Sequence, residues 1–114
     1  MDQFTREYLE TALWSSTGDD GEPLDGAYGA DDFDASAIER AAIDCAAFRA
    51  TFGAEIEGRE SDAAYDLWLT RNRHGAGFWD GDWPEPAATR MTDAAHALGE
   101  VNVYVGDTGH LYID

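Results

Sequence analysis

The sequence feature that most constrains the fold is a long apolar stripe between residues 36 and 57. Its members recur at intervals of three and four residues, the spacing of one face of an α-helix. They are Ile38, Ala41, Ala42, Cys45, Phe48, Phe52 and Ile56. Ser36 and Glu39 have the spacing of a capping box, and Gly58 is suited to end the helix. We therefore predict the longest helix over residues 36–57.

Two more helices are predicted, with an acidic loop after the first. Residues 3–15 carry apolar side chains at helical spacing behind a possible N-cap, Asp2. Residues 88–98 repeat this pattern and Gly99 ends it. Residues 15–34 mix glycine with aspartate and glutamate, which predicts a long solvated loop. Its spacing does not match a helix-loop-helix calcium site.

Three segments favour β-structure. Residues 65–70 alternate apolar and polar side chains, which predicts a strand, and Phe78 and Trp79 are expected to begin a short returning strand. Residues 101–105 and 111–113 read as a hairpin around an Asp-Thr-Gly turn. The predicted fold is therefore α+β with the order ααββαββ: a small antiparallel sheet with helices packed on one face.

Length and cysteine content fit one small domain without crosslinks. A chain of 114 residues is expected to form a single domain, 1–114. Cys45 is the only cysteine, so no internal disulfide can form, and its place on the apolar stripe predicts core packing. No apolar run approaches the roughly 18 residues that span a membrane, and no signal segment is evident. We expect a soluble protein of the cytoplasm of a host cell.

The charge balance is strongly acidic, with 24 Asp and Glu, seven arginines, no lysine and a net charge of −17. Such a surface repels nucleic acid and anionic membranes, so neither is expected as a direct partner. Three explanations stay open. The charge can be a halophilic adaptation, because screening shortens to ~3 Å near 1 M salt. It can instead mimic the DNA backbone, which predicts two rows of carboxylates on one elongated face, or it can simply aid solubility.

The candidate binding site is the one dense cluster of cationic and polar side chains, directly after the predicted strand at 65–70. Its residues are Arg71, Asn72, Arg73, His74, Gly75, Gly77, Phe78, Trp79 and Asp80. Two guanidiniums beside backbone N–H groups freed by glycine can grip a phosphate or carboxylate. The spacing matches neither the Walker loop nor the dinucleotide fingerprint.

The same loop admits other chemistries. His74 with Asp66 or Asp80 could form a base and its orienting carboxylate, but no serine or cysteine nucleophile lies in the loop. A metal site would need His74, His96 or His110 to converge with carboxylates, which the spacing does not require. The arginines could also pair internally and make the loop purely structural. No catalytic residue, cofactor or metal is predicted.

The run Trp68–Asp80 resembles a motif of small uncharacterised accessory proteins encoded by bacteriophages, archaeal viruses and related mobile elements. These often carry Thr-Arg-Asn-Gly-His-Gly-Ala-Gly-Phe-Trp-Asp, and Arg73 stands here where glycine is usual. The resemblance extends to Glu10–Ser16, to Gly21–Asp25 and to Gly99–Asp107. It implies a viral or prophage accessory protein and assigns no catalytic residue.

Together these features favour a virus- or prophage-derived acidic protein that binds a host macromolecule, most simply a host protein. One alternative is a small enzyme or binding protein for a phosphorylated or nucleotide-like ligand, using Arg71, Arg73 and His74. Another is a DNA mimic that inhibits a DNA-binding host protein. The expectation leans away from an enzyme.

Overall fold

Four helices precede a short β-hairpin along the chain. The computed structural model describes residues 1–114. The elements are α1 (Gln3–Ser15), α2 (Ala35–Phe52), α3 (Glu60–Arg71), α4 (Ala87–Leu98), β1 (Val103–Val105) and β2 (Leu111–Ile113), with 3-10 turns at Leu24–Gly26 and Ala30–Asp32. The two strands pair antiparallel, with Tyr104 opposite Tyr112. No helix is both long and apolar enough to cross a membrane.

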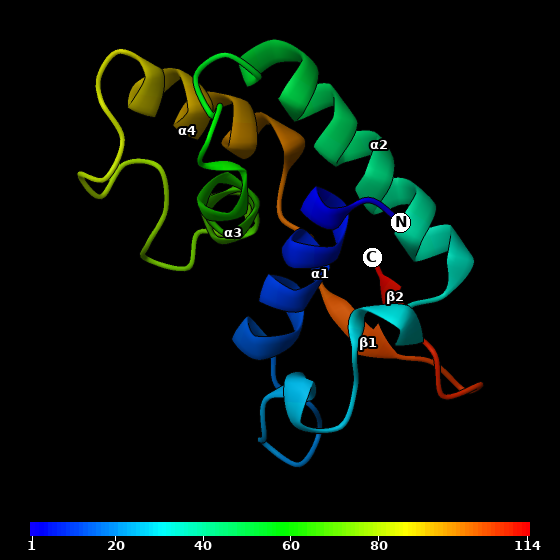
Figure 1. Ribbon diagram of the computed structural model, residues 1–114. Helices are drawn as coiled ribbons and strands as arrows, with labels where there is room; N and C mark the ends of the chain where they lie inside the picture. Colours follow the sequence, from blue (N-terminus) through cyan, green and yellow to red (C-terminus); the bar gives the residue numbers. More distant parts are fainter.

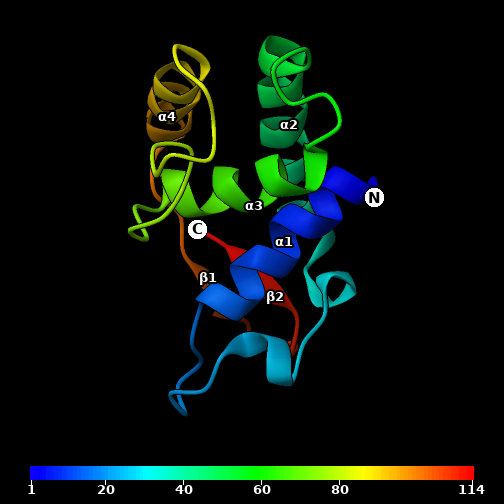
Figure 2. The same ribbon diagram turned by 60° about the vertical axis from the view of Figure 1, so that its left-hand side comes forward.

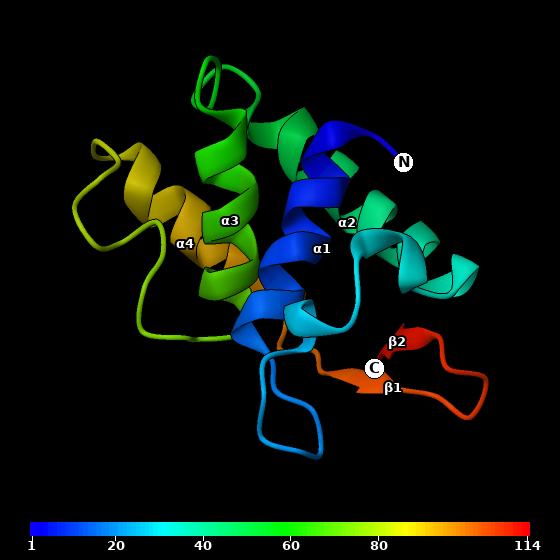
Figure 3. The same cartoon turned by 60° about the horizontal axis from the view of Figure 1, so that its bottom comes forward.

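The helices pack on one another and the hairpin lies at one end. α3 lies between α1 and α4, and α2 runs along the far side of α1 and touches α4 (Figures 1 and 2). The hairpin sits beside the segment that joins α1 to α2, away from α3 (Figure 3). The molecule is elongated, with principal extents of 43 × 26 × 23 Å.

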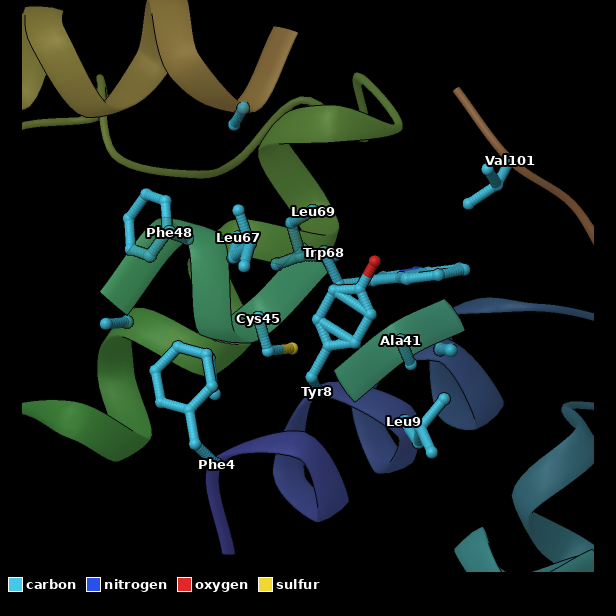
Figure 4. Packing of buried hydrophobic residues seen from close by; sticks show 14 of the residues in the cluster. Phe4, Tyr8, Leu9, Ala41, Cys45, Phe48, Leu67, Trp68, Leu69 and Val101 are labelled. Carbon is cyan, nitrogen blue, oxygen red and sulfur yellow. The ribbon is translucent and has the colours of Figure 1, made fainter. Parts of the chain in front are cut away.

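One apolar cluster of 26 buried residues forms the core. Figure 4 shows Phe4 and Tyr8 of α1 facing Cys45 and Phe48 of α2, with Trp68 of α3 behind them. The rings of Tyr8 and Trp68 meet edge to face, with centroids 5.3 Å apart. Cys45 is a buried free thiol, which confirms its predicted place in the core.

The strand predicted over residues 65–70 is wrong, because these residues belong to α3. Almost every residue from Ala63 to Arg71 is buried, and only Tyr65 is exposed among them. A helix surrounded on nearly all sides shows no polar face, so a short window of it can imitate the alternation of a strand. Glu60 and Asp62 in its first turn are the acidic start that favours the helix.

The returning strand expected at Phe78 and Trp79 is also wrong. These residues lie in a turn-rich connection between α3 and α4. Phe78 stacks on Phe48, with ring centroids 5.4 Å apart, so its apolar character serves packing rather than strand pairing. The fold is mixed α and β as predicted, but the sheet is reduced to the hairpin and the helices pack on each other instead of on one sheet face.

Most other boundaries follow the sequence. Asp2 caps α1, accepting a hydrogen bond from the Thr5 N–H at 2.7 Å. α2 is shorter than predicted: Asp34 rather than Ser36 is its N-cap, and the helix ends at Phe52 just before the weak helix former Gly53.

The acidic loop and the hairpin turn both follow prediction. Leu24 and Phe33 are buried and tie the loop of residues 16–34 to the core. Gly109 takes φ +82 in the hairpin turn, the left-handed conformation that glycine adopts without strain.

Candidate functional site

Arg71, the first residue of the predicted site, is part of the core. Its side chain is 2% exposed, and its last-turn position aims it at three other helices. Nε donates to the Gly99 carbonyl at 2.8 Å and Nη2 to the Leu98 carbonyl at 3.0 Å. Nη1 donates to the Tyr8 hydroxyl and to Asp44 Oδ2, both at 2.9 Å. Four of the five guanidinium N–H donors are thus bonded within the chain, two of them to the carbonyls at the end of α4.

Burial also keeps the Tyr8 hydroxyl beside this arginine protonated. Desolvation raises the pKa of the Tyr8 phenol, so Tyr8 stays neutral and accepts the hydrogen bond. Asp44 supplies the compensating negative charge, and its carboxylate is only partly exposed. A buried charge needs such a partner and such hydrogen bonds to be tolerated.

Asn72, Gly77 and Phe78 also hold the fold. Asn72 Oδ1 accepts from the Val101 N–H at 2.8 Å, and Nδ2 donates to the Trp68 carbonyl at 3.0 Å. Phe78 is fully buried, and its N–H donates to Thr70 Oγ1 at 3.1 Å. A Cβ at Gly77 would collide with that same Thr70 hydroxyl, so glycine is required there by space. These residues lock the end of α3 to the loop that follows.

Arg73 occupies the left-handed position after the helix. Its φ is +56, and it is the only non-glycine residue with positive φ. The Arg73 N–H donates to the Thr70 carbonyl at 3.2 Å and the His74 N–H to the Leu69 carbonyl at 3.0 Å. This pair of bonds is the Schellman ending of a helix, whose left-handed residue is usually glycine. The backbone geometry thus gives a physical reason for glycine at this position in the motif that the chain resembles.

The exposed part of the loop is split between two separate hollows. His74 lines a pocket of about 350 Å³ with Ser15, Asn72 and Glu100. Trp79 is 53% exposed and lines another hollow, together with Trp83 and the first residues of α4. The two sets of lining residues share no member, so the structure does not bring His74 and Trp79 into one site.

The carboxylates near the loop have other partners than His74. Asp80 Oδ2 accepts from the Gly77 N–H at 3.2 Å, and Asp66 Oδ2 accepts from Trp83 Nε1 at 2.7 Å. His74 is exposed. Neither carboxylate is therefore placed to orient it as a base. No group of three or more His, Cys, Asp or Glu side chains is positioned to hold a metal ion.

Asp66 is the only buried carboxylate of the 24 acidic residues. The pKa of its carboxyl is raised to about 6, mainly by burial and also by the charges of Asp80, Asp62 and Asp82, while the hydrogen bond from Trp83 opposes the rise. The guanidinium of Arg59 does not pair with Asp66. It lies over the Trp83 ring, 3.9 Å from the centroid.

A surface feature that the sequence reasoning missed is a pair of stacked aromatics on α1 and α3. Trp14 and Tyr65 are 40% and 41% exposed, and their ring centroids are 5.2 Å apart. Trp14 lies near the C-terminal end of α1, whose buried residues include Leu13 but not Trp14. Its position next to Leu13, off the buried stripe of the helix, was the signal available in the sequence.

Comparison with protein-family models, curated proteins and solved structures gave no match for this chain.

Proposed function

We propose that the protein is an accessory protein of viral or prophage origin that acts by binding a host protein. Its origin is suggested by the resemblance of the run Trp68–Asp80 to proteins of such genomes. Its mode of action is supported by one observation above all: four large aromatic side chains are exposed on an acidic surface, and three of them, Trp14, Tyr65 and Trp79, lie on or beside the helices α1 and α3. Tryptophan and tyrosine are the residues that most often carry the binding energy of protein interfaces.

The exposed aromatics have a cost that a partner would remove. Trp14 and Tyr65 stack on each other and still keep about two-fifths of each side chain in water. Trp79 keeps 53% and belongs to the motif itself. Covering the exposed part of one such side chain contributes on the order of 1 kcal/mol. Of the predicted site residues, Arg73, His74, Gly75, Trp79 and Asp80 stay as proposed contacts, because all five are exposed.

The buried members of the loop support this choice over an anion-binding enzyme. An anion clamp built from Arg71 and Arg73 would need the Arg71 guanidinium, which is 2% exposed and uses four of its five N–H donors inside the chain. Arg71, Asn72, Gly77 and Phe78 instead hold the loop rigid, which lowers the entropic cost of presenting its exposed side chains.

The distribution of acidic residues favours salt adaptation over DNA mimicry as the reason for the charge. Exposed acids occur on all four helices, in the loop of residues 16–34 and on the hairpin. Mimicry would gather them into two rows, whereas a halophilic surface spreads them over the whole protein. We therefore propose a halophilic setting and a protein partner rather than competition with DNA.

The test is affinity capture from the native host at its physiological salt, with the wild-type protein and two variants. Trp79→Ala and Trp14→Ala should each reduce recovery of a captured protein at least ~10-fold, because each removes an exposed aromatic anchor. The matched control is Ile43→Ala, which truncates a side chain 62% exposed on α2 and should leave recovery unchanged. Equal recovery with all four proteins would refute this role for the aromatics.

A further inference from the structure

The two edges of the β-hairpin are treated differently by the rest of the chain. The outer edge of β2 is covered, because the Asp34 N–H donates to the Leu111 carbonyl at 2.8 Å and Phe33 lies parallel against Leu111. The outer edge of β1 has no such cover. Natural proteins usually protect an open edge, because its free N–H and C=O groups can pair with another strand.

The hydrogen bonds of the hairpin identify which groups of β1 are free. Asn102 and Asp114 exchange two bonds of 3.0 and 2.9 Å, and Gly106 donates to the His110 carbonyl at 2.8 Å. Bonded and non-bonded pairs alternate along an antiparallel ladder, so Val103 and Val105 turn their N–H and C=O groups outward. No backbone or side-chain group of the chain bonds to them. β1 therefore offers two donors and two acceptors at the spacing of a β-strand.

A continuous groove runs along this open edge. Its other wall is the segment of residues 15–24, which lies on the same side of the molecule (Figure 3). Two adjoining hollows of about 350 and 160 Å³ share Thr17 on that wall and Val103 on the strand, and a third of about 350 Å³ continues past Val105. The groove is thus open along the whole length of β1.

Thr17 adds backbone groups to the opposite wall. It pairs with Pro23 in an isolated antiparallel bridge, flanked by bonds of 3.0 Å from Gly18 N to Glu22 O and from Leu24 N to Ser16 O. In this pattern the N–H and C=O of Thr17 point away from Pro23. They too lack a partner inside the chain.

The charge of the groove selects its occupant. Four acidic side chains line it, namely Asp19, Asp20, Glu22 and Glu100, whereas no arginine lines it and its one basic residue is His74 at one end. A cationic segment is attracted to such walls, whereas a second copy of this chain, with net charge −17, is repelled. Val103, Val105 and Leu24 supply the apolar contacts that alternate side chains of an added strand would meet.

We infer that this groove binds an extended basic segment of a partner protein, which adds as a strand to the open edge of β1. The inference rests on the proposed function, because the occupant is part of a protein, and it adds the chemistry and the mode of binding. The groove shares His74 with the proposed contacts, but neither Trp79 nor Trp14 lines it, so variants of the two tryptophans let the two proposals fail separately.

The first experiment uses an alternating Lys-Val peptide of about eight residues, long enough to cover the edge. Nitrogen-15 NMR should show the amides of Val103 and Val105 shifting on titration, and their hydrogen exchange slowing by at least ~10-fold at saturation. An alternating Glu-Val peptide should not bind. A version of the Lys-Val peptide should not bind when it is N-methylated at alternate residues, because it lacks the backbone N–H donors on the edge that would pair with β1. Equal binding of the Glu-Val or methylated peptide, or shifts confined to other residues, would overturn the inference.

The second experiment uses a variant of the strand. Val105→Pro removes one outward N–H and no bond to β2, so peptide affinity should fall by ~10-fold or more while circular dichroism stays unchanged. The control Val105→Thr keeps the N–H and the β-branch and should bind within ~2-fold of wild type. Concentration-dependent protection of the two valine amides without peptide, with a dimer by light scattering, would identify a second copy as the occupant and overturn the inference.

The same protein preparations separate the two proposals. If the Lys-Val peptide fails to bind while host capture still depends on Trp79, the groove inference falls and the proposed function stands. If the peptide binds as described while Trp79→Ala and Trp14→Ala leave capture unchanged, the groove inference stands and the aromatic surface is refuted.

Discussion

Arg71 and Arg73 are separated by one residue, yet they belong to different parts of the molecule. Arg71 is 2% exposed and donates to four oxygens from α1, α2 and the end of α4. Arg73 is exposed, and its backbone rather than its side chain has the structural role, at φ +56. The difference follows from the helix: the last residue of α3 still faces its neighbours, and two residues later the chain has left the helix. A dense cluster of polar residues is thus divided by geometry into a scaffold and a surface.

The largest expected effect is the loss of the buried arginine. Arg71→Ala should destabilise the protein by about 3–5 kcal/mol, because it leaves Asp44 and the carbonyls of Leu98 and Gly99 without their partner. Arg73→Ala should change the free energy of unfolding by less than ~0.5 kcal/mol. Urea denaturation followed by circular dichroism measures both. Similar losses for the two variants would contradict the division between scaffold and surface.

The two glycines of the loop extend the comparison to the backbone. Gly77→Ala should cost about 2–3 kcal/mol, because its Cβ would collide with the Thr70 hydroxyl that accepts the Phe78 N–H. Gly75→Ala meets no atom within 4 Å and should cost only ~1 kcal/mol for its φ of +82. Thermal unfolding of the pair gives the ordering, and an equal cost would mean that the space behind Gly77 can adjust.

Asp66 and Arg71 are both buried ionisable residues, but only Arg71 is bonded to a group of opposite charge. The folded pKa of Asp66 is raised from 3.8 to about 6, so this carboxyl favours the native state only while it is neutral. The contribution of neutral Asp66 to the free energy of unfolding is fully present below about pH 4 and is lost as the pH rises to about 6. The difference in free energy of unfolding between Asp66→Asn and wild type should therefore shift by about 2 kcal/mol in favour of the variant as the pH rises from 4 to 7. Urea titrations at both values test this, and a constant difference between the proteins would rule it out.

The smallest expected effect is a gain in stability. Arg73→Gly removes the strain of a left-handed arginine and should stabilise the protein by roughly 0.5–1 kcal/mol, part of the gain being offset by the greater chain entropy of glycine. The same change at Arg59, which lies at φ −131 before α3, should not stabilise. Chemical denaturation resolves the two, and a loss of stability in Arg73→Gly would show that the Arg73 side chain contributes more than its exposure suggests.

The predicted elements that held were those with a clear amphipathic period or a clear terminator. Residues 3–15 form a helix as their pattern and Asp2 indicated, and Gly99 ends α4 with φ +82. The helix over 60–71 was missed because it is buried on nearly every side. Hydrophobic periodicity in a sequence arises when one helix face is buried and the opposite face is exposed, and α3 has almost no exposed face.

The sequence located the candidate site but did not show which of its residues are buried and which are exposed. The motif does mark a special place, since Arg71, Asn72 and Gly77 all make contacts that other residue types cannot replace. Nothing in the local pattern says that Arg71 turns inward, because its partners Tyr8, Leu98 and Gly99 lie 27 to 63 residues away in the chain. Pairings at such separations appear only in the folded state. The open edge of β1 was hidden for the same reason.

The single guanidinium that ties α1, α2 and the end of α4 together also sets an order of events during synthesis. A nascent chain that has not yet released Gly99 from the ribosome has made Arg71 but not the carbonyls that bind it. Leu111, fully buried in the core, arrives later still. An earlier helical intermediate can offer Tyr8 and Asp44 to this arginine but lacks the two carbonyls of Leu98 and Gly99, so the last contacts of the interior form only after nearly all of these residues are translated.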